Sequence, residues 1–295
     1  MKPYYRMNTC MRFEVRPIDK ATARDIIVSN HYSHNWNTAF GVFSFGVFDD
    51  EGIAGALVYG NPMNTAAYGG ISTLPQEALT ELNRMWIDDR LGRNTESAAI
   101  AKTFRWLREH SPVQLVQTFA DGRLGVGTVY KAANFTYYGH DETLFFRDRE
   151  TGTDYHGVPL SNTAVVTPML TKNHLLVQGR LEAFTVKTHR YLYPLTRYAK
   201  RAIKLAPQPY PTYERGETWL PDYRPPASQI ARCLVMADAL GYRDMASDFD
   251  AYLHANYPPA VIGRAIADAR VNEWIAPMLA AAAAQPDLFG EAVLP

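Results

Sequence analysis

The chain has 295 residues, 47% of them apolar, which is enough for one large domain with a smaller one or for two medium-sized domains. Lys plus Arg and Asp plus Glu each total 30, so the zero formal net charge excludes a globally basic nucleic-acid binder and leaves only a local basic patch. Two distant cysteines, a polar N-terminal stretch and the lack of any apolar run near the roughly 20 residues of a membrane span predict a cytoplasmic protein with no membrane association.

The first half of the chain alternates strand and helix patterns. A strand is expected to end at Pro17, and Asp19 is expected to cap the helix that follows it. Two runs rich in Val, Phe and Ile on either side of residues 49–52 predict a hairpin. Further strands are expected at residues 79–88, 113–121 and 142–148, and helices at residues 94–110 and 126–135. This alternation indicates an α/β fold.

The second half of the chain has a different composition. Residues 183–211 contain no acid and interleave tyrosines with basic residues, a pattern that suits phosphate contacts on DNA but also fits a solvated helix face. The expected DNA-binding residues are Lys187, Arg190, Arg197, Lys200 and Arg201. A proline-rich linker or arm follows, and helices are expected from Ala227. We therefore divide the chain into residues 1–160, 161–226 and 227–295.

The stretch from Phe119 to Gly139 contains three closely spaced glycines. Their Gly-x-x-Gly-x-Gly spacing is not that of a dinucleotide fingerprint, so we interpret them as turn residues. The strand, short helix and strand of this region resemble the last motif of the GNAT acyltransferases, and residues 81–107 resemble the fourth strand, pyrophosphate loop and helix of that fold. The resemblance implies a GNAT-like core with a mixed central sheet flanked by helices, plus a C-terminal helical appendage.

An anion site at a helix start is part of the same resemblance. Free N–H groups and the helix dipole favour phosphates there. The residues expected to bind the cofactor are Arg90, Arg93, Asn94 and Thr95. The usual small residues of the acyltransferase loop are replaced by bulky Arg93 and Asn94, which argues against ordinary acetyl-CoA binding.

Five segments in the same order resemble the phage Mom-type DNA-modification proteins, which are related to GNAT enzymes. The segments are residues 29–36, 81–88, 94–102, 119–139 and 187–195. The resemblance implies transfer of a carbamoylmethyl group to N6 of adenine in double-stranded DNA, by a phage- or prophage-encoded protein in a bacterial host. The active-site residues that it implies are His31, Tyr32, Arg84, Ser97, Asp121 and Tyr130. It also implies iron and a donor that is not an obvious acyl-CoA. Imidazole and hard oxygen ligands suit iron, so the expected ligands are His31 and Asp121 with Tyr32 or Tyr130.

The chemistry of adenine N6 gives these residues possible roles. The N6 lone pair is delocalised into the ring, so alkylation needs a proton acceptor, for which Asp121 or His31 is available. Tyr130 could donate a proton to the leaving group, and Arg84 could hold an anionic donor. Each residue also has a structural interpretation: Asp121 as a turn cap, His31 as a loop residue and Tyr130 as a core tyrosine. Ser97 could equally be an ordinary residue of a helix start.

Three classes of function follow from these patterns. The first is a DNA-adenine-modifying transferase. The second is an acetyl-CoA-dependent N-acyltransferase acting on a small amine or protein, and the third is a non-enzymatic DNA-binding or interaction module. Residues Gln285–Phe289 resemble the peptide by which bacterial proteins dock on the sliding clamp, although they could instead pack back on the helical region.

Overall fold

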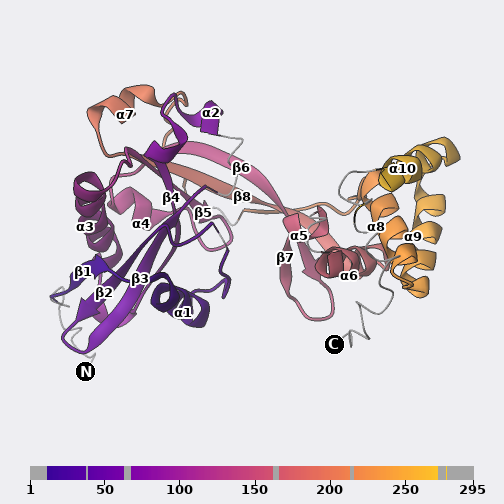
Figure 1. Cartoon of the computed structure of the whole chain (residues 1–295), viewed down its shortest axis with the longest axis horizontal. Helices are drawn as coiled ribbons and strands as arrows, with labels where there is room; N and C mark the ends of the chain where they lie inside the picture. Colours follow the sequence, from indigo (N-terminus) through magenta and orange to yellow (C-terminus); the bar gives the residue numbers. More distant parts are fainter. Residues whose placement is uncertain are drawn as a thin grey trace. The chain divides into compact units, whose positions relative to one another are not determined.

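The computed structural model divides into two compact units (Figure 1). It describes residues 12–37, 39–62, 68–161, 166–212, 216–271 and 277. Unit 1 comprises Met1–Asp141 and Lys187–Gly216, and unit 2 comprises Glu142–Val186 and Glu217–Pro295. Within these described ranges, no helix has the length and apolar character needed to cross a membrane. The clamp-like peptide Gln285–Phe289 lies outside them.

Unit 1 is built on a mixed sheet in which the strands follow the order β1-β2-β3-β4-β5-β8-β6. The strands are β1 (Glu14–Pro17), β2 (Phe43–Asp49), β3 (Gly52–Gly60), β4 (Leu79–Ile87), β5 (Leu115–Asp121), β6 (Thr136–Asp148) and β8 (Leu181–Pro194). β4 and β5 pair in parallel, whereas β1 to β4 pair antiparallel in sequence and β5 pairs antiparallel with β8. The predicted α/β fold with a mixed sheet is confirmed.

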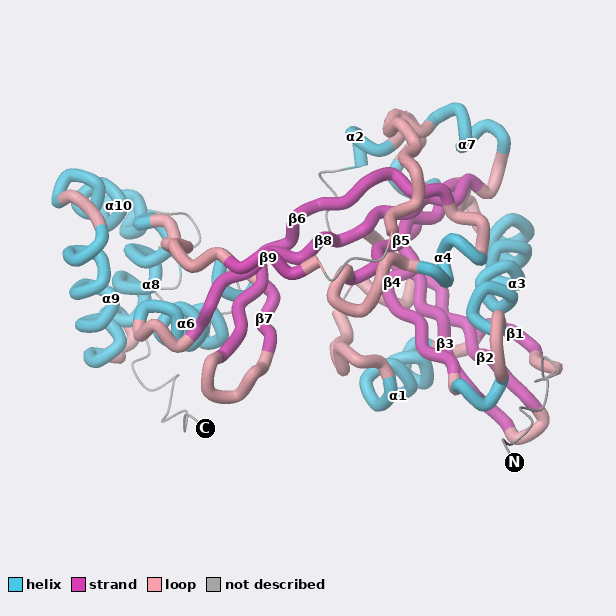
Figure 2. The backbone as a smooth tube through the Cα atoms, turned by 180° about the vertical axis from the view of Figure 1, so that it is seen from behind, coloured by secondary structure: helices cyan, strands magenta, loops and turns pink. Residues whose placement is uncertain are grey.

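Helices cover both faces of this sheet (Figure 2). They are α1 (Lys20–Asn30), α2 (Tyr68–Ile71), α3 (Thr95–His110), α4 (Thr128–Ala132) and α7 (Arg197–Ala202), with short turns η2 (Gln76–Ala78) and η3 (Asp89–Leu91). Asp19 begins α1 as expected, because its carboxylate accepts the Thr22 N–H at 2.9 Å. Ile27 of α1 packs in one hydrophobic cluster, and Phe104 and Leu107 of α3 pack in a separate, larger one.

Much of the acid-free segment at residues 183–211, which we expected to contact DNA, is a core strand. β8 lies between β5 and β6 and pairs with β5 from Leu115 opposite Pro194 to Asp121 opposite Thr188. Because β6 and β8 each contribute residues to both units, the units end at other positions than the three regions expected from the sequence. The expected DNA-binding residues are thereby divided between strand β8 and helix α7.

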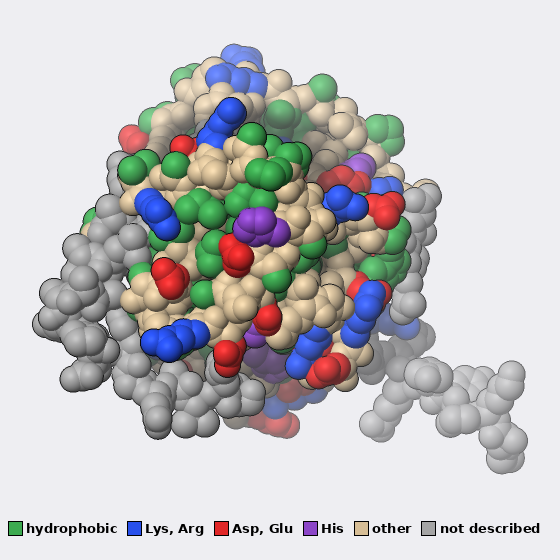
Figure 3. Space-filling view, turned by 90° about the vertical axis from the view of Figure 1, so that its right-hand side faces the viewer, with side chains coloured by type: hydrophobic (Ala, Val, Ile, Leu, Met, Phe, Trp, Pro, Cys, Tyr) green, Lys and Arg blue, Asp and Glu red, His purple; other side chains and the backbone are tan. Residues whose placement is uncertain are grey.

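Unit 2 combines a small sheet with a layer of helices. Its remaining elements are β7 (Asp154–His156), β9 (Glu217–Trp219), α5 (Val158–Ser161), α6 (Val166–Val177), α8 (Ala227–Ala239), α9 (Arg243–Asn256) and α10 (Pro259–Val271). β7 pairs with β6 and β9 with β8, both antiparallel. Helices α8–α10 and α6 share one core that contains Ile230 and Phe249, which confirms the predicted C-terminal helical region. Figure 3 shows a face on which apolar, acidic and basic side chains are interspersed.

Candidate active site

β4 and β5 run side by side over a short distance only. Their parallel pairing ends where Glu81 lies opposite Gln117, and the Thr118 hydroxyl then donates to the Leu82 carbonyl at 3.1 Å. β4 nevertheless continues to Ile87, so the two strands separate. The carboxyl ends of parallel strands are the usual position of a site in α/β proteins. Polar residues on both sides of this separation are therefore the first candidates.

A bulge in β4 decides which way Arg84 points. Asn83 has no partner on β3, and this extra residue reverses the alternation of the strand. Leu82 consequently packs in the core beneath α3, whereas Trp86 packs with the α1 layer. The Arg84 guanidinium lies with Trp86, 4.7 Å from the ring centre of Phe40. Arg84 and Trp86 therefore lie on the face of the sheet opposite to that of Leu82.

The Arg84 guanidinium is only partly satisfied by the protein. Its Nη1 donates to the Asn83 carbonyl at 2.7 Å, but its Nε is buried without a partner among the described residues. Burial lowers the pKa of Arg84, and the negative charges that Tyr32 and Glu81 can carry oppose that shift. An unused, sequestered guanidinium N–H suits a ligand that presents an anion or a carbonyl oxygen.

Glu81 is the main candidate that our sequence reasoning missed. It is only 6% exposed, and its two carboxylate oxygens accept N–H groups from Asn83 at 2.9 Å and Gln117 at 3.1 Å. The remaining amide oxygens of Asn83 and Gln117 are buried without a partner in the described structure. The only signal in the sequence was an acid within an otherwise strand-like run. A buried carboxylate beside unsatisfied polar atoms is characteristic of a functional site rather than of a packed core.

Two tyrosines reach this cluster from different elements. Burial raises the pKa of Tyr130 on α4, against the effect of its hydrogen bond with Thr118, and the charge of Glu81 raises it further. Loss of solvation at the hydroxyl also raises the pKa of Tyr32, next to α1, although much of this residue is exposed, and the charge of Asp121 adds to that effect. Both hydroxyls therefore keep their protons at neutral pH.

His31, at the end of α1, is buried against the same cluster. Burial lowers its pKa to about 4, with a contribution from the Arg84 charge, so the ring is neutral at pH 7. The Ser33 backbone N–H donates to Nδ1 at 3.2 Å, which leaves the proton of the neutral ring on Nε2. In this arrangement His31 presents an N–H donor at Nε2. Its ring centre lies 4.2 Å from that of Tyr32.

Because His31 is buried, we expect the free energy of unfolding to decrease at acidic pH. The unfolded chain binds a proton at this residue below pH 6.5, whereas the folded protein resists protonation down to about pH 4. The free energy of unfolding therefore falls as the pH falls through this window, by about 1.4 kcal/mol per unit. Urea unfolding measures this effect. We expect the difference in the free energy of unfolding between the wild type and His31→Gln to shrink by about 2 kcal/mol from pH 6.5 to pH 5. Parallel pH dependence in both proteins would contradict a buried, neutral His31.

Asp121 is held by Arg123 in the turn that follows β5. The guanidinium forms a two-pronged ion pair with the carboxylate, at 2.6 and 3.0 Å, and the Arg123 backbone N–H donates to it at 3.0 Å. The turn-capping interpretation is thus confirmed. Both oxygens of Asp121 are thus engaged by Arg123 and are not open to a metal ion. This arrangement of His31, Tyr32 and Asp121 does not fit an iron site, so we assign no step to a metal.

The predicted anion loop has a separate set of contacts. Ser97 donates to the Asn94 carbonyl at 3.1 Å, Thr95 donates to two preceding backbone carbonyls, and Arg90 forms ion pairs with three carboxylates. Arg93 and Asn94 are exposed, and the Asn94 side chain makes no capping bond to α3. Among the described contacts, none joins this loop to the cluster around Glu81. The structure therefore brings together five of the six implied active-site residues and leaves Ser97 apart.

The mixed sheet and the buried polar cluster at its separating strands define an enzyme-like site on an α/β scaffold. A model of the Mom protein family matches residues 12–212, and the chain belongs to that family. The methylcarbamoylase Mom of Escherichia phage Mu is 35% identical over 143 residues, which are 47% of this chain and 58% of that relative. The match thus spans less than two thirds of the relative's length.

Solved acetyltransferases show a looser likeness. Arabidopsis thaliana NAA60, in complex with a bisubstrate analogue, is 9% identical with a TM-score of 0.39, over 62% of this chain and 98% of its own. An N-acetyltransferase from Staphylococcus aureus Mu50 is 11% identical with a TM-score of 0.34, over the same shares. Likeness at this level assigns neither a donor nor a substrate.

Proposed function

We propose that this protein is a DNA-modifying transferase that attaches a carbamoylmethyl group to N6 of adenine and so protects phage DNA from restriction nucleases. The proposal rests on one observation above all: the buried cluster of Glu81, Arg84 and Tyr130 at the separation of β4 and β5 lies within the part of the chain that matches the Mom family. The 35% identity to the phage Mu methylcarbamoylase supports the same reaction.

The cluster contains the groups that alkylation of a weakly nucleophilic amine requires. Adenine N6 forms a bond to the methylene carbon of the donor while the bond from that carbon to the leaving group breaks. The N6 proton passes to the Glu81 carboxylate, and the Tyr130 hydroxyl gives its proton to the leaving group. Arg84 binds the carbonyl oxygen or an anionic part of the donor through its unused Nε–H. The donor must therefore carry the leaving group on the methylene carbon of the carbamoylmethyl group, which an ordinary acyl-CoA thioester does not.

His31 and Tyr32 are the residues that we assign to the target base. A base in duplex DNA must leave the stack before its N6 reaches a buried carboxylate. Tyr32 is 57% exposed and lies beside the His31 ring, which gives a flat surface for an extrahelical base. The His31 Nε2–H supplies a donor for one of the ring nitrogens of adenine. Ser97 and the exposed Arg93 and Asn94 belong to the proposed anion site for the donor.

We assign the contact with the DNA backbone to the α7 surface, defined by Arg197, Tyr198, Lys200 and Arg201. All four are exposed, and the three cations have no partner among the described residues. Arg190 of β8, by contrast, is paired with Asp141 at 2.6 Å. Cations without a carboxylate partner are the ones that release counterions from DNA when they bind phosphates.

The α7 surface yields a prediction on salt dependence. The double variant Arg197→Ala with Arg201→Ala removes two phosphate contacts, so the slope of log K against log salt should decrease by about 2. A filter-binding or anisotropy titration at several salt concentrations measures that slope. The matched control replaces Arg264 and Arg270, two exposed arginines of α10, by Ala. Equal slopes for both double variants would rule out the α7 surface as the DNA contact.

The whole proposal is tested by mass spectrometry of nucleosides from the DNA of cells that express the protein. We expect an adenosine species heavier by one carbamoylmethyl group, and its absence at good expression would overturn the proposal. An acetylated amine or protein without any modified adenosine would favour the acyltransferase alternative instead.

A further inference from the structure

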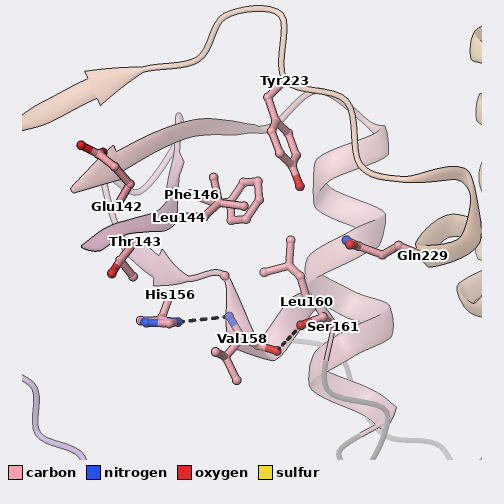
Figure 4. A pocket seen from close by; sticks show the side chains of 11 residues that line it. Glu142, Thr143, Leu144, Phe146, His156, Val158, Leu160, Ser161, Tyr223 and Gln229 are labelled. Atoms are coloured by element: carbon pink, nitrogen blue, oxygen red, sulfur yellow. Dashed lines mark hydrogen bonds between the residues drawn. The ribbon is translucent and has the colours of Figure 1, made fainter. Parts of the chain in front are cut away.

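Unit 2 contains a cavity that the proposed transferase reaction does not use. Its volume is about 350 Å³, at the small end of the range for ligand pockets. It lies between the end of β6, helix α5 and the segment before α8 (Figure 4). The apolar lining comes from Leu144, Phe146, Val158 and Leu160, with the ring of Tyr223 on one side.

Most polar groups at the cavity satisfy one another. The Val158 N–H donates to His156 Nδ1 at 3.1 Å, and the Ser161 hydroxyl donates to the Val158 carbonyl at 3.2 Å (Figure 4). Two polar groups differ: the hydroxyl of Tyr223 and the side-chain carbonyl of Gln229 have no partner among the described residues. They point toward one another across the cavity.

A hydrogen bond to the Asn173 side chain fixes the orientation of the Gln229 amide. Both hydrogens of the Asn173 amide donate to backbone carbonyls, those of Leu160 at 2.7 Å and Met169 at 2.9 Å. The oxygen of Asn173 must therefore accept, and it does so from Gln229 Nε2 at 2.7 Å. Gln229 is 9% exposed and lines the cavity, and with its Nε2 bound to Asn173 the side-chain carbonyl oxygen is the acceptor that it offers there.

The Tyr223 hydroxyl supplies the complementary donor. Burial raises the pKa of Tyr223, so the hydroxyl keeps its proton at neutral pH. The Tyr223 ring stands at 73° to that of Phe146 with centres 5.3 Å apart, which gives two aromatic walls at an angle. A hydroxyl donor next to a fixed carbonyl acceptor, between aromatic walls, is complementary to a flat molecule that carries an acceptor beside a donor.

From this arrangement we propose that the cavity binds an uncharged heterocycle of nucleobase type, through Tyr223 and Gln229. Each common nucleobase has an edge that places a ring or carbonyl acceptor beside an N–H donor, as these two side chains require. Phosphate is disfavoured, because the described lining residues include no Lys or Arg and do include Glu142. The same chemistry occurs in a free nucleoside and in an unstacked base of a single strand, and the proposal does not depend on the transferase reaction.

Calorimetric titration of the full chain tests this proposal. The probes are the four common nucleosides, their monophosphates and a short single-stranded oligonucleotide. We expect at least one nucleoside to bind, its monophosphate to bind more weakly, and Tyr223→Phe to weaken nucleoside binding about threefold to tenfold, as loss of one hydrogen bond implies. Tyr252→Phe, a half-buried tyrosine of α9 that does not line the cavity, is the matched control.

The titration distinguishes a free nucleoside from an unstacked base of a single strand. If Tyr223→Phe weakens a nucleoside, the ligand is a free nucleoside or base. If it weakens only the oligonucleotide, the cavity takes a base from a strand. The proposal is overturned if no probe binds, or if Tyr223→Phe and Tyr252→Phe bind every probe as the wild type does. Because Tyr223→Phe removes one oxygen that has no partner among the described residues, it leaves the packing of unit 2 intact.

Discussion

Replacement of Glu81 by Gln is expected to lower the amount of modified adenine by about 100-fold or more, the usual loss when a general base is removed. The variant keeps the size of the side chain but has no carboxylate to take the N6 proton. It also turns an NH₂ group toward Asn83 or Gln117, which already donate to this site, at a cost of about 1–3 kcal/mol in stability. Nucleoside mass spectrometry of host DNA measures the first effect, and urea unfolding measures the second.

Two further variants separate chemistry from folding at this position. Glu77→Gln alters an exposed glutamate of η2, a few residues before β4, and should leave modification unchanged. Glu81→Asp retains a carboxylate and should recover part of the activity. Full modification by a folded Glu81→Gln protein would show that Glu81 is not the proton acceptor.

Tyr130→Phe is expected to have the second largest effect, a loss of about 100-fold in the rate of modification, because the leaving group no longer receives a proton. The ring should stay in place, since it packs on Phe135 and Tyr191 with ring centres 5.6 and 5.5 Å away. Thr118, which bonds to Tyr130, retains its bond to the Leu82 carbonyl. Stability should therefore change by no more than about 1 kcal/mol.

Tyr138→Phe is the control for Tyr130→Phe. Tyr138 is half-buried and packs in a different cluster of unit 1, so its hydroxyl should not affect modification. Single-turnover kinetics on a duplex that contains one adenine distinguishes a slower chemical step from weaker DNA binding. Equal rates for Tyr130→Phe and the wild type would remove Tyr130 from the mechanism.

The sequence predicted elements well where local signals agree. The Asp19 cap, the hairpin around residues 49–52 and the helical spacing in α3 depend on neighbours within a few residues, and each is confirmed. β8 was interpreted through its charge, whereas the half-buried Arg190 between buried His189 and Tyr191 reflects its place in the sheet between β5 and β6. Strand pairing over such sequence distances has no local signature.

In the candidate site, too, local motifs were predictive and contacts between distant residues were not. Family-like motifs pointed to His31, Tyr32, Arg84, Asp121 and Tyr130, which lie in one electrostatically coupled cluster. Glu81 was missed because its burial depends on Gln117, which lies 36 positions further along the chain. The orientation of Arg84 was likewise set by the unpaired residue Asn83, and a bulge of that kind is not visible in a period-two pattern.

The hydrogen bond from Gln229 to Asn173 bears on where the chain can be shortened. The part that matches the family ends at residue 212, yet Asn173 within it bonds to Gln229 of α8 beyond it. Met169 and Leu170 of α6 are buried in the core that α8–α10 complete. A protein cut at residue 212 would retain every residue of the candidate active site but leave α6 with an uncovered apolar side and an amide without its donor. The end of the family match at residue 212 therefore divides unit 2, whose core includes residues on both sides of it.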